Sequence, residues 1–420
     1  MTTPGLAERL AALRAAQPAR PVPRRPELDR AALLARWFGA RLEVVDDGAS
    51  LVVERRVPLS ARATARLATL APATYFDTET TGLSTGAGTI IFLAGLAQVE
   101  GTALAVRQYL LPDYPHERPL LRGVAGALGA LPRVVTYNGR TFDLPLLASR
   151  LTVQGLFAEQ AALPALHDDL LPVARRLWRR PLGGARLATV EAAVLGVRRS
   201  SDCPSSEVPA RYFSFLRGGG PELLAAVLDH NLQDCVSLAL LEAELAGLRD
   251  GGWREAPVLD ARGMALDLLR AGALDEALEL LDTAVGTADP DEGLRLRRLA
   301  SRLLLASGAI ERAEELWRAA TRRASVEAAA AWVEVARIRE RQRGDVPGAL
   351  EAVTAASRVL DIALALGRGG SIASLGRIRL LVEGRRRRLR RRVAAAERRD
   401  GRGARSREAD DAVDQRSVAA

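Results

Sequence analysis

Short apolar runs of alternating pattern, separated by polar turns, fill the middle of the chain. In order, the pattern predicts strands at 73–78, 88–98 and 103–111, a helix at 117–130, a strand at 132–137, a helix at 143–151 and a short β-type run at 163–167. Three β-runs joined by short turns and then followed by alternating helix and strand indicate a mixed sheet covered by helices. The pattern therefore predicts an α/β domain over residues 70–249.

Residues 27–69 read as a helical pattern followed by a hairpin. Two β-type runs, 41–45 and 50–57, flank an Asp-Asp-Gly-Ala stretch. An Asp-Gly pair between alternating segments is typical of a hairpin turn. We expect a small helix-hairpin extension packed beside the α/β domain, without chemistry of its own, and a mobile leader over residues 1–26.

The pattern becomes purely helical between residues 258 and 366, where a period of 36 residues appears. Two sets of small residues carry it: Gly272, Gly308 and Gly344, and Ala277, Ala313 and Ala349. Each Gly lies in a short turn between two helical runs, and the period is slightly longer than the ~34 residues of a tetratricopeptide unit. Two interpretations stay open: an antiparallel helical array used for packing, and a scaffold that binds a protein partner.

Most of the net positive charge lies at the end of the chain. All 60 basic residues are arginine, and the net charge is +9. Residues 385–420 hold 13 Arg against 6 Asp and Glu, which is +7, so the preceding 384 residues carry only +2. We expect residues 367–420 to form a helix and then an Arg-rich disordered tail, either inert or bound to phosphate backbones by salt-sensitive contacts.

Length and composition limit the number of domains and the classes of protein to which the chain can belong. A chain of 420 residues suggests two or three domains. It contains no charge-free apolar stretch of 18 residues and no basic-then-apolar signal pattern at its N-terminus, so we expect a soluble, cytoplasmic protein. The two cysteines, Cys203 and Cys235, form no CxxC motif and are expected to be structural.

An acid pair ends the first predicted strand of the α/β domain. Asp77 and Glu79 are two positions apart, and alternate strand residues point to one side, about 6–7 Å apart. Two anions that close repel unless a cation lies between them, and oxygen ligands suit Mg²⁺ or Mn²⁺. The pair predicts a site for a hard divalent ion, whereas a solvated strand surface is the ordinary alternative.

Asp143 follows a predicted strand and a Gly turn, at the start of a predicted helix. Pro145 just inside the helix supports this placement. A helix cap and a metal ligand are compatible roles for Asp143, and Asn138 in the turn is placed to orient either one.

His230 and Asp234 are four residues apart on a predicted helix and therefore share one face. Such a pair is more often a surface contact than a site. An imidazole nevertheless takes up a proton near neutral pH, which a hydrolytic metal site can use.

Three segments resemble the exonuclease motifs of the DEDD superfamily: 76–83, 137–143 and 230–234. Together with segment 167–191, they resemble the bacterial YprB-type group, in which a nuclease domain precedes tetratricopeptide-like helices. The resemblance covers roughly residues 40–250, with a looser match over 258–366. It implies an α/β, ribonuclease H-like mixed sheet with flanking helices, followed by an all-α helical-repeat domain.

The resemblance also implies a nuclease site with two ions, Mg²⁺ or Mn²⁺, and a metal-dependent 3′–5′ exonuclease activity on DNA or RNA. The metal-binding acids would be Asp77, Glu79, Asp143 and Asp234, with His230 near the attacking water, and the substrate-binding residues would be Thr80, Thr81, Gly82, Leu83 and Asn138. One departure concerns His230, which lies four residues before Asp234, the spacing of the tyrosine branch, whereas the histidine branch uses five. Its role as general base is therefore open.

Two other functions fit the same sequence. One is a structure-selective endonuclease on the same fold, and the other is an adaptor with an inactive nuclease fold whose helical repeats bind a protein. The four acids favour an enzyme over an adaptor. No base-reading aromatic cluster distinguishes DNA from RNA.

Overall fold

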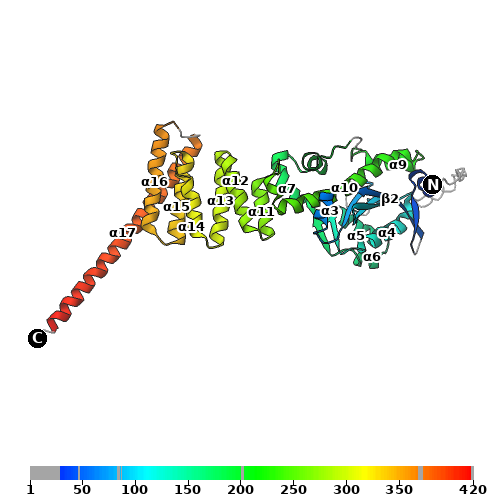
Figure 1. The fold of residues 1–420 in the computed structure, drawn as a ribbon. Helices are drawn as coiled ribbons and strands as arrows, with labels where there is room; N and C mark the ends of the chain where they lie inside the picture. Colours follow the sequence, from blue (N-terminus) through cyan, green and yellow to red (C-terminus); the bar gives the residue numbers. More distant parts are fainter. Residues whose placement is uncertain are drawn as a thin grey trace, which may run out of the picture. The chain divides into compact units, whose positions relative to one another are not determined.

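The structure of the chain is a computed structural model that describes residues 29–45, 48–82, 86, 88–199, 203–367 and 372–417. The predicted leader lies outside these residues. The chain divides into two compact units, Met1–Leu248 and Arg249–Ala420 (Figure 1). Within the described residues no helix is long and apolar enough to cross a membrane.

A seven-stranded mixed sheet forms the centre of the first unit, with strand order β1-β2-β5-β4-β3-β6-β7. The strands are β1 (Arg41–Val45), β2 (Gly48–Pro58), β3 (Thr74–Thr80), β4 (Ile91–Glu100), β5 (Ala103–Leu110), β6 (Arg133–Thr136) and β7 (Leu166–Asp169). Strands β1 to β5 pair antiparallel, whereas β6 pairs parallel with both β3 and β7. The predicted mixed sheet is confirmed.

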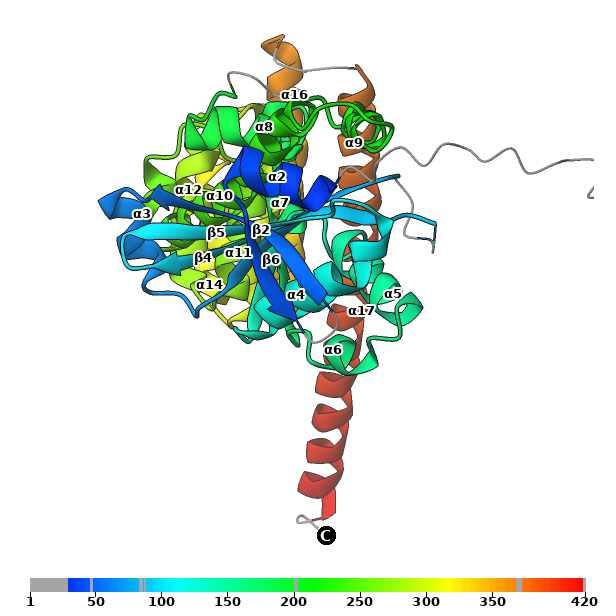
Figure 2. The same ribbon diagram turned by 90° about the vertical axis from the view of Figure 1, so that its right-hand side faces the viewer.

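Helices cover both faces of this sheet, and α4, α5 and α6 gather on one of them (Figure 2). The helices of the unit are α2 (Arg30–Phe38), α3 (Ala61–Leu67), α4 (Glu117–Gly129), α5 (Asp143–Val153), α6 (Phe157–Ala161), α7 (Leu170–Leu182), α8 (Leu187–Val190), α9 (Val208–Leu216) and α10 (Glu222–Arg249), with a 3₁₀ turn at Tyr114–His116 and a π-helical turn at Glu191–Leu195. Both cysteines are buried and neither forms a disulfide.

The N-terminal hairpin is part of the main sheet rather than a separate extension. Strand β2 pairs with β5 from Leu51↔Leu110 to Pro58↔Ala103. Its residues Leu51 to Val53 are buried in the same core as Leu34 of α2. Pairing of β2 covers the edge that β5 would otherwise expose, which explains why the hairpin joins the sheet.

The second unit consists of helices: α11 (Ala261–Arg270), α12 (Leu274–Thr287), α13 (Pro290–Ala306), α14 (Ile310–Ala319), α15 (Val326–Gln342), α16 (Val346–Ala365) and α17 (Ile372–Ser417). Gly272, Gly308 and Gly344 follow α11, α13 and α15 with φ of 82°, 78° and 66°. Glycine ends a helix in this left-handed conformation without strain. The 36-residue period thus corresponds to three helix pairs, and their assignment as tetratricopeptide units stays a prediction.

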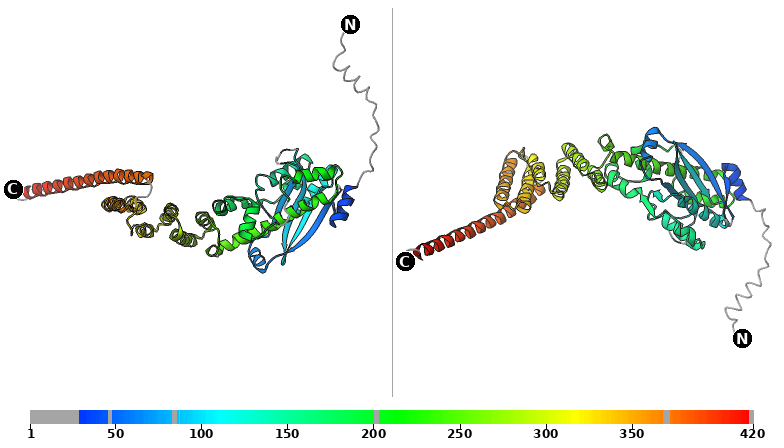
Figure 3. Two further views of the ribbon diagram at one scale, coloured as in Figure 1. Left: turned by 90° about the horizontal axis from the view of Figure 1, so that it is seen from above. Right: turned by 60° about the horizontal axis from the view of Figure 1, so that its bottom comes forward.

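The structure describes the Arg-rich end of the chain as helix up to Ser417, and the disorder of the tail stays a prediction. Helix α17 runs as one element to Ser417 (Figure 3). Its residues Val382 and Leu389 are buried. Arg388 and Arg392 both pair with Glu340 of α15, whose side chain is almost fully buried. Apolar contacts and ion pairs therefore anchor residues 382–392, the first part of the Arg-rich segment.

Candidate active site

Alternate residues of β3 face helix α10. Tyr75 donates a 2.7 Å hydrogen bond to Glu242 in the C-terminal half of α10. Asp77, two residues along, accepts a 2.9 Å hydrogen bond at Oδ2 from Asn231 in the N-terminal half. The helix therefore runs along the strand in the opposite direction, and its N-terminal half lies beside the two acids of β3.

A glycine on the neighbouring strand allows this close approach. Gly95 of β4 pairs with Asp77 of β3. A Cβ atom at Gly95 would lie 2.2 Å from Asn231 Oδ1 and 2.7 Å from Cys235 Sγ. Both distances are far below contact, so any larger residue at position 95 would push α10 away from Asp77.

We expect Gly95→Ala to lower the free energy of unfolding by about 1–3 kcal/mol, the usual cost of overpacking. It should also move Asn231 away from Asp77. Chemical denaturation measures the stability loss. Gly126→Ala is the matched control, because Gly126 is exposed on α4 and its added Cβ would meet nothing within 4 Å. Equal stability of the two variants would contradict the close-packing argument.

A chain of buried amides fixes the orientation of the Asn231 side chain. Gln108 of β5 donates to Asn231 Oδ1 at 3.0 Å and to the carbonyl of Leu228 at 2.8 Å. Since its oxygen is used by Gln108, Asn231 presents its NH₂ group to Asp77, reaching the carboxylate at 2.9 Å and the backbone carbonyl at 3.2 Å. Asp77 is thus held by a donor that cannot rotate away.

Asp143 is the first residue of α5 and accepts a 2.5 Å hydrogen bond from the Thr78 hydroxyl. It does not cap the helix: the cap position is Phe142, which makes no side-chain cap bond. An acid in the first turn is favoured by the helix dipole. Burial nevertheless dominates and raises the pKa of Asp143 to about 6, against the lowering effect of the Thr78 hydrogen bond.

The turn before α5 is organised by Asp169, a residue that sequence reasoning did not single out. Its carboxylate accepts from the backbone N–H of Asn138 (2.8 Å) and of Arg140 (3.2 Å). It also caps α7 by accepting from Leu171 N (3.0 Å). Its neighbour Asp168 pairs instead with Arg133 at 2.9 Å.

Asn138 itself adopts a left-handed backbone with φ of 72°, a conformation that asparagine tolerates better than most residues. Its side-chain oxygen accepts from the Thr141 hydroxyl at 2.9 Å. Asn138 therefore shapes the turn that leads into Asp143. A direct contact with substrate stays a prediction.

The segment after β3 uses its hydroxyls internally. Thr80 donates to the carbonyl of Gly82 at 2.7 Å, and Thr81 Oγ1 accepts from the backbone N–H of Ile90 at 2.9 Å. Leu83 lies outside the described residues. These bonds fix the turn beside Glu79, and its role in substrate binding stays a prediction.

The four predicted acids act on one another electrostatically. Burial raises the pKa of Asp77 well above its usual value, and the charges of Asp234, Asp143 and Glu79 raise it further. The hydrogen bond from Asn231 opposes these effects only in part. Because all three other acids act on Asp77, the structure brings β3, the start of α5 and helix α10 together around one carboxylate.

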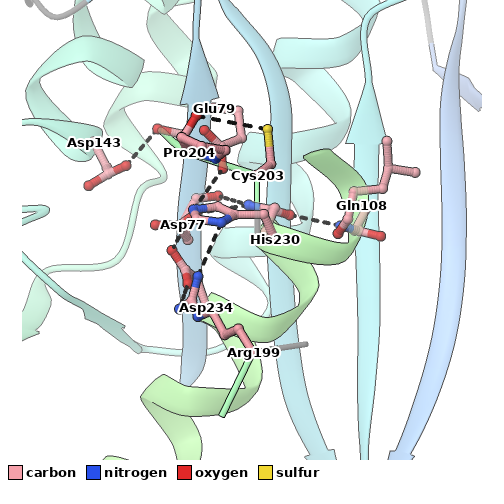
Figure 4. A network of polar contacts seen from close by, with 12 residues as sticks. Asp77, Glu79, Gln108, Asp143, Arg199, Cys203, Pro204, His230 and Asp234 are labelled. Atoms are coloured by element: carbon pink, nitrogen blue, oxygen red, sulfur yellow. Dashed lines mark hydrogen bonds and ion pairs between the residues drawn. The ribbon is translucent and has the colours of Figure 1, made fainter. Parts of the chain in front are cut away.

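Arg199 is the principal cation of this cluster (Figure 4). It lies after the π-helical turn and donates to both carboxylate oxygens of Glu191, at 2.8 and 2.7 Å. It also donates to Asp234 and lies 3.1 Å from Nδ1 of His230. Burial raises the pKa of Asp234, while His230 and Arg199 lower it.

The imidazole of His230 lies between two acids. Its Nε2 atom is 3.6 Å from Asp234 Oδ2 and 3.9 Å from Glu79 Oε1. The predicted pair on α10 is therefore part of the cluster rather than a surface contact, since the His230 side chain is only 9% exposed.

The carboxylates fit a hard divalent cation by their chemistry. Among the described residues, no group of three or more His, Cys, Asp or Glu side chains is arranged as a ready-made metal site. The donor set is nevertheless all oxygen, and the mutual repulsion that raises the pKa of Asp77 is the repulsion that a bound cation relieves. The ligands would have to converge further on binding.

Comparison with known proteins finds a family model that matches the part of the chain holding this cluster. Residues 74–246, which include all five candidate catalytic residues, match the model of the RNase_H superfamily. These residues form a ribonuclease H-like domain. Over 168 residues the chain is 42% identical to the uncharacterized protein YprB of Bacillus subtilis (strain 168).

The match to YprB covers 40% of this chain and 40% of the relative, so the chain spans less than half of that relative's length. A family B DNA polymerase from the archaeon Pyrobaculum calidifontis is similar over 43% of this chain and 25% of its own, with 16% identity and a TM-score of 0.35. At that score the likeness is too weak to support an inference. The ribonuclease H-like domain rests on the family model and the YprB match.

Proposed function

We propose that the ribonuclease H-like domain hydrolyses phosphodiester bonds of nucleic acid with divalent metal ions, as a 3′–5′ exonuclease. One observation carries the proposal: Asp77 lies in the combined field of Asp143, Glu79 and Asp234, which come from three separate elements. A fold that only needed stability would not gather four acids there, because buried carboxylates that repel one another are costly. A cation-dependent reaction explains the arrangement.

Asp77, Glu79, Asp143 and Asp234 would hold two ions, Mg²⁺ or Mn²⁺. When bound, such ions supply charge that activates water and stabilises the leaving oxygen. Asn231 orients the Asp77 carboxylate, and the Thr78 hydroxyl orients that of Asp143. The turn after β3 would pack on the terminal nucleotide and favour attack from a 3′ end.

The test uses end-labelled linear single- and double-stranded DNA and RNA, each beside a covalently closed circle of the same sequence. With Mn²⁺, we expect stepwise shortening of at least one linear substrate from its 3′ end and no cleavage of the circles. Cutting of a circle would identify an endonuclease. Absence of cleavage with every substrate and ion would contradict the proposal and favour the adaptor.

The solvent-facing arginines of α17 are expected to strengthen substrate binding. Arg387, Arg390 and Arg391 are exposed and share one helical face, which differs from the face of Arg388 and Arg392 that pairs with Glu340. Replacing all three by Gln should flatten the dependence of log K on log[salt] by up to about 3 units, since each phosphate contact contributes about 0.9. Fluorescence anisotropy over a salt series measures this slope.

The matched control replaces Arg388 and Arg392, which face Glu340, by Gln. This pair should lower stability, because it leaves a buried carboxylate unpaired, and should change the salt slope much less. If the exposed triple variant keeps the slope of the unmodified protein, α17 makes no phosphate contact.

A further inference from the structure

The segment 170–199 carries an unusual surplus of positive charge. It holds seven Arg and one acid, Glu191, which is +6. Because residues 1–384 carry +2 in all, the remainder of that range carries −4. The segment forms α7, α8 and the π-helical turn. Within residues 1–384 the surplus of positive charge therefore lies in this one stretch, and such a surplus attracts phosphate groups.

Both ends of this segment are anchored at the acid cluster. Asp169, directly before it, accepts hydrogen bonds from the backbone of the turn that leads into Asp143, and its charge acts on that carboxylate. Arg199, the last residue of the segment, donates to Asp234. The segment therefore begins and ends beside two of the candidate metal ligands.

Tyr137 joins the middle of the segment to the same turn. Its hydroxyl donates a 2.8 Å hydrogen bond to the backbone carbonyl of Ala185. Burial raises the pKa of Tyr137, and the positive charge of Arg175 opposes this effect. Arg175 of α7 and Arg186, the residue after Ala185, therefore both lie near Tyr137.

Three arginines of the segment face solvent. Arg175 and Arg179 are exposed and four residues apart on α7, so they share one helical face, whereas Leu177 and Trp178 are buried. Arg186 is exposed directly before α8. Among the residues that the structure describes, none forms an ion pair with any of these three arginines. Their guanidinium groups can bind a phosphate without first breaking an internal pair.

The surface of the segment offers no ring on which a base could stack. Its only aromatic residue, Trp178, is 1% exposed. Proteins that bind single strands through their bases use exposed aromatic side chains, whereas contacts to phosphates carry no sequence information. The chemistry of this surface therefore suits the backbone of a nucleic acid and not its bases.

We propose that Arg175, Arg179 and Arg186 form a phosphate-binding track that holds the backbone of a nucleic-acid strand beside the acid cluster, whatever its base sequence. Nucleic acid is favoured over other polyanions because the track borders the cluster that is proposed to cut phosphodiester bonds. The role of the track in cleavage rests on the proposed function. The binding of phosphates by the track does not, so the two can fail separately.

The test measures binding of a labelled oligonucleotide to the full-length protein by fluorescence anisotropy over a salt series, in EDTA to prevent cleavage. Replacing the three track arginines by Gln should flatten the dependence of log K on log[salt] by about 2–3 units, since each phosphate contact contributes about 0.7–0.9. Such a change corresponds to about 10²-fold weaker binding at 0.1 M salt. Oligonucleotides of unrelated sequence should show the same loss.

Two further variants separate the track from general effects of charge. Arg36, Arg55 and Arg56 are exposed residues of α2 and β2, and strands β4 and β5 lie between β2 and β3. Replacing these three by Gln removes the same charge and should change the slope by less than one contact, about 0.9. Replacing the track arginines by Lys keeps three point charges and should keep most of the slope. Equal flattening by the two Gln triples would overturn the track.

Chemical denaturation shows whether each variant is folded. The midpoint should stay that of the unmodified protein, since the substituted side chains are exposed. If the track triple does not fold, the single variants Arg175→Gln and Arg179→Gln decide. Each should flatten the slope by about 0.7–0.9, and no change in either would overturn the proposal.

Cleavage by the same variants shows whether the track serves the acid cluster. Arginines that hold the backbone away from the reacting bond should, when replaced, raise KM as much as binding weakens, with kcat little changed. A folded track triple with an unchanged salt slope would overturn the proposal and assign these arginines to another polyanion, such as an acidic protein, while cleavage by the unmodified protein would still support the proposed function. An unmodified protein that binds but cleaves nothing would refute the proposed function, and the salt series would still decide the track.

Discussion

Replacing Asp77 by Asn is expected to lower metal-dependent cleavage about 10³-fold or more. Asp77 is the carboxylate on which the other three acids act, and its loss removes the charge that attracts a cation to the cluster. Metal ions supply several kcal/mol of transition-state stabilisation, and each 1.36 kcal/mol is about tenfold in rate. Initial rates under saturating Mn²⁺ measure the loss.

The fold should survive this change, because the Asn oxygen can still accept from Asn231. Asp168→Asn is the matched control: Asp168 is also an acid of the sheet, but it is exposed and pairs with Arg133 outside the cluster. We expect this control to keep most of its activity. Equal rates for Asp77→Asn and the unmodified protein would remove the β3 acids from the chemistry.

The second large effect is a stability gain in Asp143→Asn when metal is absent. The pKa of Asp143 is about 6 in the folded protein, against about 3.9 in an unfolded chain. Between these values the unfolded state releases its proton first, so folding stability falls as pH rises and then levels off above pH 6. A difference of two pKa units corresponds to about 3 kcal/mol in the free energy of unfolding. The Asn variant has no such titration and should not lose this stability.

Chemical denaturation in EDTA at pH 4 and pH 8 tests this sign. The variant should gain over the unmodified protein mainly at pH 8. Added Mn²⁺ should reverse the order, because a ligand at ~1,000 times its Kd stabilises the binding-competent protein by about 4.1 kcal/mol, more than the variant gains. A variant that is less stable than the unmodified protein at pH 8 in EDTA would contradict the repulsive character of the cluster.

The regular parts of the fold followed from periodicity. Strand β3 was predicted at 73–78 and lies at Thr74–Thr80, and helix α4 was predicted at 117–130 and lies at Glu117–Gly129. Alternation and helical spacing carry this information locally. The membership of β2 in the main sheet depends on an edge offered by β5, far along the chain, and no local pattern contains it.

Some residues of the candidate site could likewise be predicted from local spacing, whereas others could not. Asp77, Glu79 and the His230–Asp234 pair were visible because their spacing matches a strand or a helix. Asn231 carried one usable signal, since the chain has only two asparagines. It was missed because its function requires the glycine opposite Asp77, a relation between two strands and a helix.

Arg199 and Glu191 carried no comparable signal. One arginine among 60 basic residues, all of them arginine, does not stand out, and its partner Asp234 is 35 residues away. The same holds for Glu340, which is remote from the α17 arginines that it binds. Ion pairs between distant segments are set by tertiary packing, so sequence patterns give the charges but not their partners.

The most direct test of the account is anomalous scattering from crystals of the full-length protein grown with Mn²⁺. We predict two anomalous peaks about 3.5–4 Å apart, contacted by Asp77 and by carboxylates of α5 and α10. Crystals of Asp77→Asn grown in the same way should lose at least one of them. Well-diffracting crystals of the unmodified protein without a peak at this cluster, or with manganese bound only elsewhere, would contradict the claim that these acids form a metal-dependent catalytic site.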